Sequence, residues 1–198
     1  MTPPRRTPKG EATRQRLLNA AGAELVANDG VVEIAAVAQR AGVSPSLLYK
    51  YFAGKGELVA AVVESVFERF DETVMRPELR EVGLTWIVRE RERVRRFVTF
   101  FYDDPLALTV VRLMVGEPEA AQARQSRMAW QTLAAAQNIR RGQAAGDLPI
   151  DVDADVTAAF LMGGLFESLS VALTADPVWE RQRVTARLQG LLAAVVAT

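Results

Sequence analysis

Between residues 44 and 55 the chain offers side chains that suit binding to a polyanion. Hydroxyls, phenol rings and ammonium groups recur there without an intervening acid, at Ser44, Ser46, Tyr49, Lys50, Tyr51 and Lys55. Ammonium groups attract phosphates, and hydroxyls hydrogen-bond both phosphate oxygens and base edges. This composition therefore favours contact with a DNA groove.

Two short helices are needed to position this segment. Residues 33–41 carry apolar side chains at i, i+3, i+4 and i+7, which form a single stripe on a helix of about two turns. Gly42 permits a sharp turn, and Ser44 followed by Pro45 is a typical helix start. The pattern predicts a helix-turn-helix motif over residues 33–52.

The second of these helices has two unlike sides. At about 100° per residue, Leu48 and Phe52 share a buried side, and Ser46 and Lys50 point the opposite way. Lys55 begins the next helix, where its ammonium and the free backbone N–H groups form a phosphate clamp. We expect the DNA contacts to come from Arg14, Ser44, Pro45, Ser46, Leu47, Tyr49, Lys50, Tyr51 and Lys55.

The charge distribution agrees with this placement. Formal net charge is zero, with 24 basic and 24 acidic residues. Residues 1–56 nevertheless hold eight Lys or Arg against four acids, a net charge of +4, so the other 142 residues sum to −4. A basic amino-terminal part on an acidic body indicates a polyanion partner for one end only.

The residue types that are missing exclude several classes of site. The chain has no Cys and no His, which excludes disulfides, zinc held by Cys or His, and nucleophilic centres that need a His base. Asp151, Asp153 and Asp155 resemble the start of a calcium loop, but Val156 and Met162 stand where Gly and Glu are required. We therefore expect a protein that is not an enzyme, without metal or cofactor, and those aspartates to cap a helix.

The flanking segments predict a cytoplasmic protein with no membrane contact. No apolar run approaches the roughly 20 residues of a membrane helix, and residues 1–10 lack the apolar stretch of a signal peptide. Those ten residues are expected to be a disordered basic arm, because they combine Pro, Arg and Lys.

The rest of the chain follows helical periodicity without persuasive strand alternation, so an all-α fold of about nine helices is expected. We assign residues 11–71 to a three-helix DNA-binding headpiece and 72–198 to a larger helical body. Helices of the body are predicted at 82–102, 104–114, 117–144, 152–174 and 177–196, with breaks at Gly and Pro between them.

The run Ala41–Leu58 resembles the signature of the TetR family of transcriptional regulators: A-G-V-S, then L-Y-x-[YH]-F, then x-x-K-x-x-L. The segments Ile139–Gly142, Gly146–Leu148, Asp151–Asp155 and Phe160–Gly164 resemble carboxy-terminal helices of that family more loosely. The resemblance implies a homodimer on a palindromic double-stranded DNA operator, controlled by a small molecule in the body. It departs at Glu33, where the family usually has Thr or Ser, and in a loop about two residues shorter before it.

The body must then hold a ligand pocket and a dimer face. Large apolar side chains are the pocket candidates, for an apolar or aromatic ligand: Trp86, Phe97, Phe100, Phe101, Met114, Met128, Trp130 and Phe166. Two apolar stripes on the last helices are the dimer candidates: Leu161, Gly164, Leu165, Leu169, Leu188, Leu191, Leu192 and Val195. The same residues could instead form plain core within one chain.

These observations favour a DNA-binding repressor that a small ligand releases. Two alternatives stay open at this point. One is a helical-bundle enzyme that uses carboxylates and a divalent metal, and the other is a helical adaptor that binds no DNA.

Overall fold

The computed structural model describes residues 7–75, 84–112 and 118–196, and within these ranges the chain is all α, as expected. Nine α-helices and one π-helical turn follow each other along it. They are α1 (Pro8–Ala27), α2 (Ile34–Arg40), α3 (Pro45–Leu48), α4 (Lys55–Phe70), η1 (Asp71–Met75), α5 (Trp86–Asp103), α6 (Pro105–Arg112), α7 (Pro118–Ala144), α8 (Ala154–Thr174) and α9 (Arg181–Val196).

The first helix begins earlier than the sequence pattern indicates. The Thr7 side chain accepts a hydrogen bond from the Gly10 N–H, and Pro8 stands at the first helical position. Both are strong start signals, so residues 8–10 are helical and do not belong to a disordered arm. Thr13 lies inside the helix, where its hydroxyl donates to the Lys9 carbonyl at 3.0 Å.

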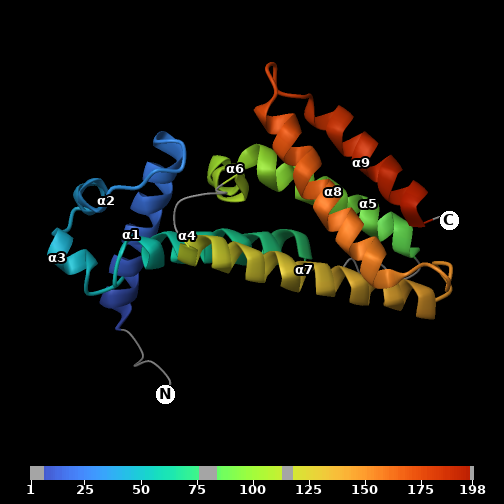
Figure 1. Cartoon of the computed structure of the whole chain (residues 1–198), viewed down its shortest axis with the longest axis horizontal. Coiled ribbons are helices and arrows are strands. Elements are labelled where there is room, and N and C mark those ends of the chain that lie inside the picture. Colours follow the sequence, from blue (N-terminus) through green and yellow to red (C-terminus); the bar gives the residue numbers. More distant parts are fainter. Residues whose placement is uncertain (1–6, 76–83, 113–117, 197–198) are drawn as a thin grey trace.

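The molecule has a small end and a large end (Figure 1). Helices α1, α2 and α3 form the headpiece together with the start of α4, which runs on into the body beside α7. Helix α6 packs against α1, so the body touches the headpiece at a second place. At that contact Gly22 leaves room for Leu106, whose Cδ2 would lie 2.7 Å from a Cβ on residue 22.

Trp86 fixes one end of the body. It is almost completely buried, its ring Nε1 donates to the Asn138 carbonyl, and its backbone N–H donates to Asp147. Gly142 allows this wedge, because a Cβ there would meet the Trp86 ring at 2.7 Å. Gly142 and Asp147 belong to the carboxy-terminal segments that resemble the family more loosely. Both are therefore explained by their packing around Trp86.

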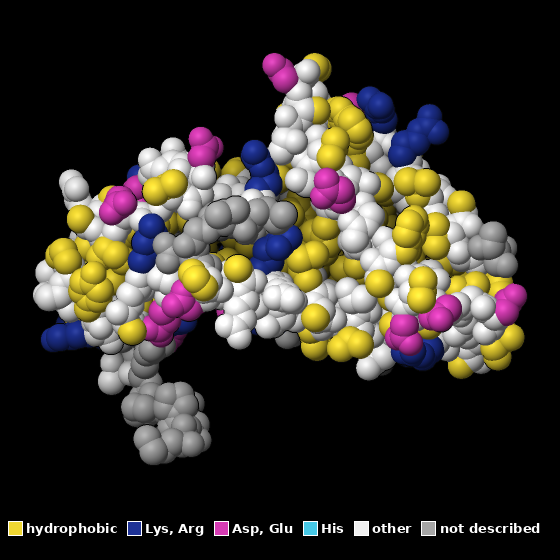
Figure 2. Space-filling view, in the orientation of Figure 1, with side chains coloured by type: hydrophobic (Ala, Val, Ile, Leu, Met, Phe, Trp, Pro, Cys, Tyr) yellow, Lys and Arg dark blue, Asp and Glu magenta, His cyan; other side chains and the backbone are white. Residues whose placement is uncertain are grey.

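Helix α8 is the one helix in the described ranges that is long and apolar enough, by length and composition alone, to cross a membrane. This corrects the expectation that no segment approaches that length. About 28% of its apolar window is buried, and hydrophobic side chains lie exposed on this part of the surface (Figure 2). Val156 and Phe160 are the most exposed, at 67% and 65%.

Candidate nucleic-acid interface and ligand cavity

The turn of the predicted helix-turn-helix is set by Gly42 and Ser44. Gly42 has φ +65°, a left-handed conformation that favours glycine, and the next amide, of Val43, closes the turn on the Ala38 carbonyl at 3.0 Å. The Ser44 hydroxyl accepts from the Leu47 N–H at 3.2 Å and so caps α3. The turn and the helix start therefore lie where the sequence predicts them.

The two sides of α3 also separate as predicted. Leu48 and Phe52 are 0% and 2% exposed, whereas Ser46 and Lys50 face solvent and Tyr49 is 55% exposed. The regular helix ends at Leu48, and residues 49–51 continue as a turn whose amides bond back to residues 45–48. In the space-filling view, hydrophobic-type side chains, a class that includes Tyr, gather over α3 beside a basic side chain (Figure 2).

Two further cations belong to the headpiece. The Arg14 guanidinium of α1 lies over the Phe52 ring, 5.5 Å from its centroid, which ties α1 to the end of the recognition segment. Lys55 is the first residue of α4, whose N-cap is Gly54 with no side-chain cap. Pro45 and Ser46 are exposed and Leu47 and Tyr51 are half-buried, so each keeps some surface accessible to a partner.

Helix α2 supports the motif from behind. Glu24 of α1 is buried and accepts from Arg40 at 2.6 Å and from the Asn28 side-chain amide at 2.9 Å. This bonding fixes the end of α2 against α1. At the other end Glu33 is the N-cap, exposed and without a side-chain capping bond, so the carboxylate faces solvent at the start of the motif.

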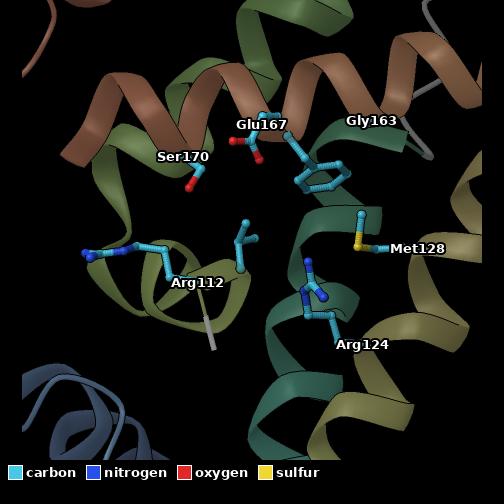
Figure 3. Close-up of a pocket in the computed structure, with 8 residues that line it drawn as sticks. Arg112, Arg124, Met128, Gly163, Glu167 and Ser170 are labelled. Carbon is cyan, nitrogen blue, oxygen red and sulfur yellow. The ribbon is translucent and has the colours of Figure 1, made fainter. Parts of the chain in front are cut away.

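The body contains a cavity of about 350 Å³ between α6, α7 and α8. Figure 3 shows Glu167 and Ser170 projecting from α8, with Arg124 and Met128 on the facing helix α7. Its lining is mixed in polarity: Val111, Arg112, Arg124, Met128, Gly163, Phe166, Glu167 and Ser170. Sequence reasoning named two of these, Met128 and Phe166, because it sought aromatic and Met side chains. The i, i+4 spacing of Arg124 and Met128 could have found a third.

The other pocket candidates are dispersed. Trp86 is the structural wedge described above, and Trp130 is 47% exposed. Phe97, Phe100 and Phe101 form an aromatic cluster with Phe70 and Phe166, with ring centroids 5.2–6.1 Å apart. Met114 lies outside the described residues. The seven candidates within the described residues thus divide between core, surface and cavity wall.

The dimer candidates divide as well. Leu169, Leu188 and Leu192 are buried within the chain's own core, so they cannot form a face between subunits. Leu161, Leu165 and Val195 are half-buried, whereas Gly164 is exposed and Leu191 is 59% exposed. The exposed apolar face of α8 is instead built on Val156, Phe160, Gly164 and Val171, most of which the sequence reasoning missed.

Within the described ranges, no group of acids could hold a metal ion. Asp153 caps α8 by accepting from the N–H groups of Asp155 and Val156, and Asp104 caps α6 by accepting from Leu106 and Ala107. Of the three aspartates that resemble a calcium loop, Asp153 therefore caps a helix start, as predicted.

Comparison with known proteins places the chain in a structural context. Residues 18–62 match the family model for bacterial regulatory proteins of the tetR family. The fold is similar to that of the fatty acid degradation regulator FadR from Bacillus halodurans, with a TM-score of 0.80, 16% identity and 96% of each chain covered.

Two other solved structures are similar over nearly their whole length. GusR from Salmonella enterica has a TM-score of 0.76 at 20% identity, covering 94% of this chain and 96% of that one. FadR from Bacillus subtilis, in complex with stearoyl-CoA, has a TM-score of 0.75 at 16% identity, covering 92% and 98%. No curated protein matches the chain by sequence.

Proposed function

We propose that this chain is a TetR-family repressor that binds a palindromic operator as a homodimer and leaves it when a small molecule enters the body, because residues 18–62 match the tetR family model and the whole fold is similar to that of FadR. This family consists of regulators and not of enzymes, so the metal-dependent enzyme is set aside. Its members bind DNA, which sets aside the adaptor.

One observation carries the DNA-binding part of the proposal. The exposed face of α3 has hydroxyls, phenols and an ammonium but no acid, and it borders Lys55 at the start of α4. The first turn of α3 would meet base edges, and Tyr49 and Lys50 would meet phosphates. Burial of Leu48 and Phe52 supports this assignment, because it leaves only one side of the segment free for DNA.

The exposed apolar face of α8 supports the homodimer. Val156, Phe160, Gly164 and Val171 are spaced along one side of the helix and are exposed in a single chain. A second copy would cover them by packing helix on helix, as a two-fold interface requires. A lipid surface suits this face poorly, because the exposed acids Asp155 and Glu167 lie on the same helix.

Two contacts would carry a signal from the cavity to the headpiece. Phe166 lines the cavity and packs with Phe70, the last residue of α4, whose first residue is Lys55 about 22 Å away. Helix α6 lines the cavity with Val111 and touches α1 through Leu106 and Gly22. A ligand that favours one placement of α4 or α6 would thereby change the spacing of the two headpieces.

The similar Bacillus subtilis FadR structure holds stearoyl-CoA, which supports a small-molecule effector for this fold. The cavity side chains Met128 and Phe166 support an apolar or aromatic portion in that effector. The effector would release DNA, because repression by a ligand-released dimer is the mode that the family resemblance implies.

The test is binding to DNA from upstream of the protein's own gene, with four single substitutions as reporters. Lys50→Ala and Lys55→Ala should weaken binding to every sequence alike, since they remove phosphate contacts. Changes at Ser46 or Leu47 should alter sequence preference instead. A footprint that lacks two-fold symmetry, or binding that none of the four substitutions affects, would overturn the proposal.

A further inference from the structure

We propose that the effector of the cavity carries a negative charge, which Arg124 binds, on an apolar body that Met128 and Phe166 cover. The inference rests on the proposed function in one respect, the identification of this cavity as the effector site. It specifies the ligand as an anionic amphipath with a carboxylate or phosphate head, and not a neutral apolar or aromatic compound.

The unmet hydrogen bond of Arg124 is the first observation. Its Nε atom has no access to solvent and no hydrogen-bond partner among the described residues. Arg124 as a whole is only half-buried and forms no ion pair within the described residues, and an anionic oxygen is the acceptor that matches such a guanidinium best. Figure 3 shows the Arg124 side chain directed between Met128 and α8, whereas Arg112 extends away from that space.

Another arginine of the same helix makes the contrast. Arg127, three residues farther along α7, binds Glu64 at 2.5 Å and the buried Asp71 at 3.3 Å. Arg124 has no ion pair of this kind within the described part of the chain, although Glu167 also lines the cavity. Of these two α7 arginines, Arg127 therefore stabilises the fold through ion pairs, whereas the charge of Arg124 is left available for a ligand.

The balance of charge over the cavity also favours an anion. Arg112 and Arg124 contribute two positive charges, and Glu167 contributes one negative charge. Glu167 is exposed, so water screens it, whereas Arg124 is partly buried and its field in the cavity is stronger. Ser170 adds a hydroxyl that can donate to the same head group.

The volume of the cavity and its apolar lining indicate the remaining properties of the ligand. A volume of about 350 Å³ lies near the lower end of the range of small-molecule sites, about 300–1,000 Å³. Val111, Met128 and Phe166 cover part of that space with apolar surface. A single medium-length chain with one charged end fits both properties, so decanoate is a suitable probe.

The experiment measures binding of three probes with the same ten-carbon chain to the full-length protein by calorimetry: decanoate, 1-decanol and decyltrimethylammonium, each below its micelle concentration. Decanoate should bind roughly tenfold to a hundredfold more tightly than the alcohol, as for one hydrogen bond to a charged group. The ammonium should bind most weakly. Equal affinities, preference for the ammonium, or no binding of decanoate would each overturn the inference.

Two variants connect the preference to one side chain. Arg124→Met should bring decanoate affinity down to that of the alcohol and leave the alcohol unchanged, because Met keeps an apolar side chain of similar length. Arg187→Met on α9, an exposed arginine that does not line the cavity, should leave the preference intact. Circular dichroism and thermal unfolding confirm that both variants fold. A preference that survives Arg124→Met contradicts the assignment.

A separate readout distinguishes this inference from the proposed function. Operator binding is followed by fluorescence anisotropy as decanoate is added to the wild-type protein. Loss of DNA binding with decanoate supports both. Binding of decanoate through Arg124 without any effect on DNA leaves the charge preference standing and contradicts the proposed release mechanism.

Discussion

The headpiece and the body satisfy their buried polar groups to different degrees. In the headpiece the buried carboxylate of Glu24 has both Arg40 and Asn28 as partners. In the body, within the described ranges, four buried side-chain atoms have no hydrogen-bond partner: Glu90 Oε1, Arg93 Nε, Arg124 Nε and Gln131 Oε1.

This difference indicates that the headpiece and the body would have different roles. In the headpiece, a capped turn and a filled hydrophobic core hold the α3 face in place. The body leaves hydrogen-bonding capacity unused on α5 and α7. Buried polar groups without hydrogen-bond partners lower the stability of a region. A ligand that hydrogen-bonds with them can shift the conformation of that region.

The largest expected effect comes from comparing two arginines of α7. Arg127→Met should destabilise the protein by about 3–5 kcal/mol, because it leaves the carboxylate of Asp71, which is 1% exposed, with only the Gln131 amide at 3.1 Å. Arg124→Met should change stability by less than about 1 kcal/mol, because it removes a group that is already unsatisfied. Urea unfolding at one fixed protein concentration measures both.

Equal losses of stability for the two substitutions would contradict the contrast between Arg127 and Arg124. A large loss for Arg124→Met would mean that its guanidinium is part of the fold in the way that Arg127 is. A small loss for Arg127→Met would mean that Asp71 does not depend on it.

The next effect concerns Glu90. Burial raises the pKa of Glu90 above its ordinary value of 4.5, although the positive charges of nearby arginines, Arg93 foremost, act in the opposite direction. The folded state therefore favours the protonated form, so the stability that Glu90 contributes is complete below pH 4.5 and is lost as pH rises through the raised pKa. Glu90→Gln cannot ionise and should be more stable than wild type by roughly 1–3 kcal/mol at neutral pH.

Unfolding of the two proteins across pH 4 to 8 checks the sign. Their stabilities should converge at the acidic end and separate as pH rises. A constant difference would show that the carboxyl is solvated in the folded chain, which would weaken the contrast between the two regions.

The smallest expected effect comes from Glu33. It tests whether the headpiece already binds DNA as well as it can. Glu33 is an uncapped, exposed carboxylate at the start of the motif, and DNA phosphates would repel it. Glu33→Thr should change stability by only ~0.5 kcal/mol, since a new cap offsets the lost charge–dipole interaction. It should tighten DNA binding by roughly twofold to tenfold. Glu33→Gln separates the causes, because it removes the charge without adding a good cap.

The headpiece could be predicted from sequence because its decisive signals are local. Gly42 requires the left-handed turn, Ser44 and Pro45 begin α3, and the angular separation of Leu48 from Lys50 decides which side is buried.

The body could be predicted only in outline. Helix α8 is apolar around most of its circumference, so periodicity does not decide which of Leu169 and Phe160 faces inward. Packing against the rest of the body decides it, and that information is not local. The cavity was missed for a related reason. Arg124 resembles a surface arginine in sequence, and only the tertiary structure deprives its Nε of both water and a partner.

The central claim is that the acid-free face of α3 reads DNA. Its most direct test is the affinity for a duplex selected from upstream DNA, measured by fluorescence anisotropy between about 50 and 200 mM salt. The account predicts a steep linear fall of log affinity with log salt, by about 0.9 per neutralised phosphate, and a slope lower by about one for Lys50→Ala. A flat salt dependence, or an unchanged slope for Lys50→Ala, would contradict it.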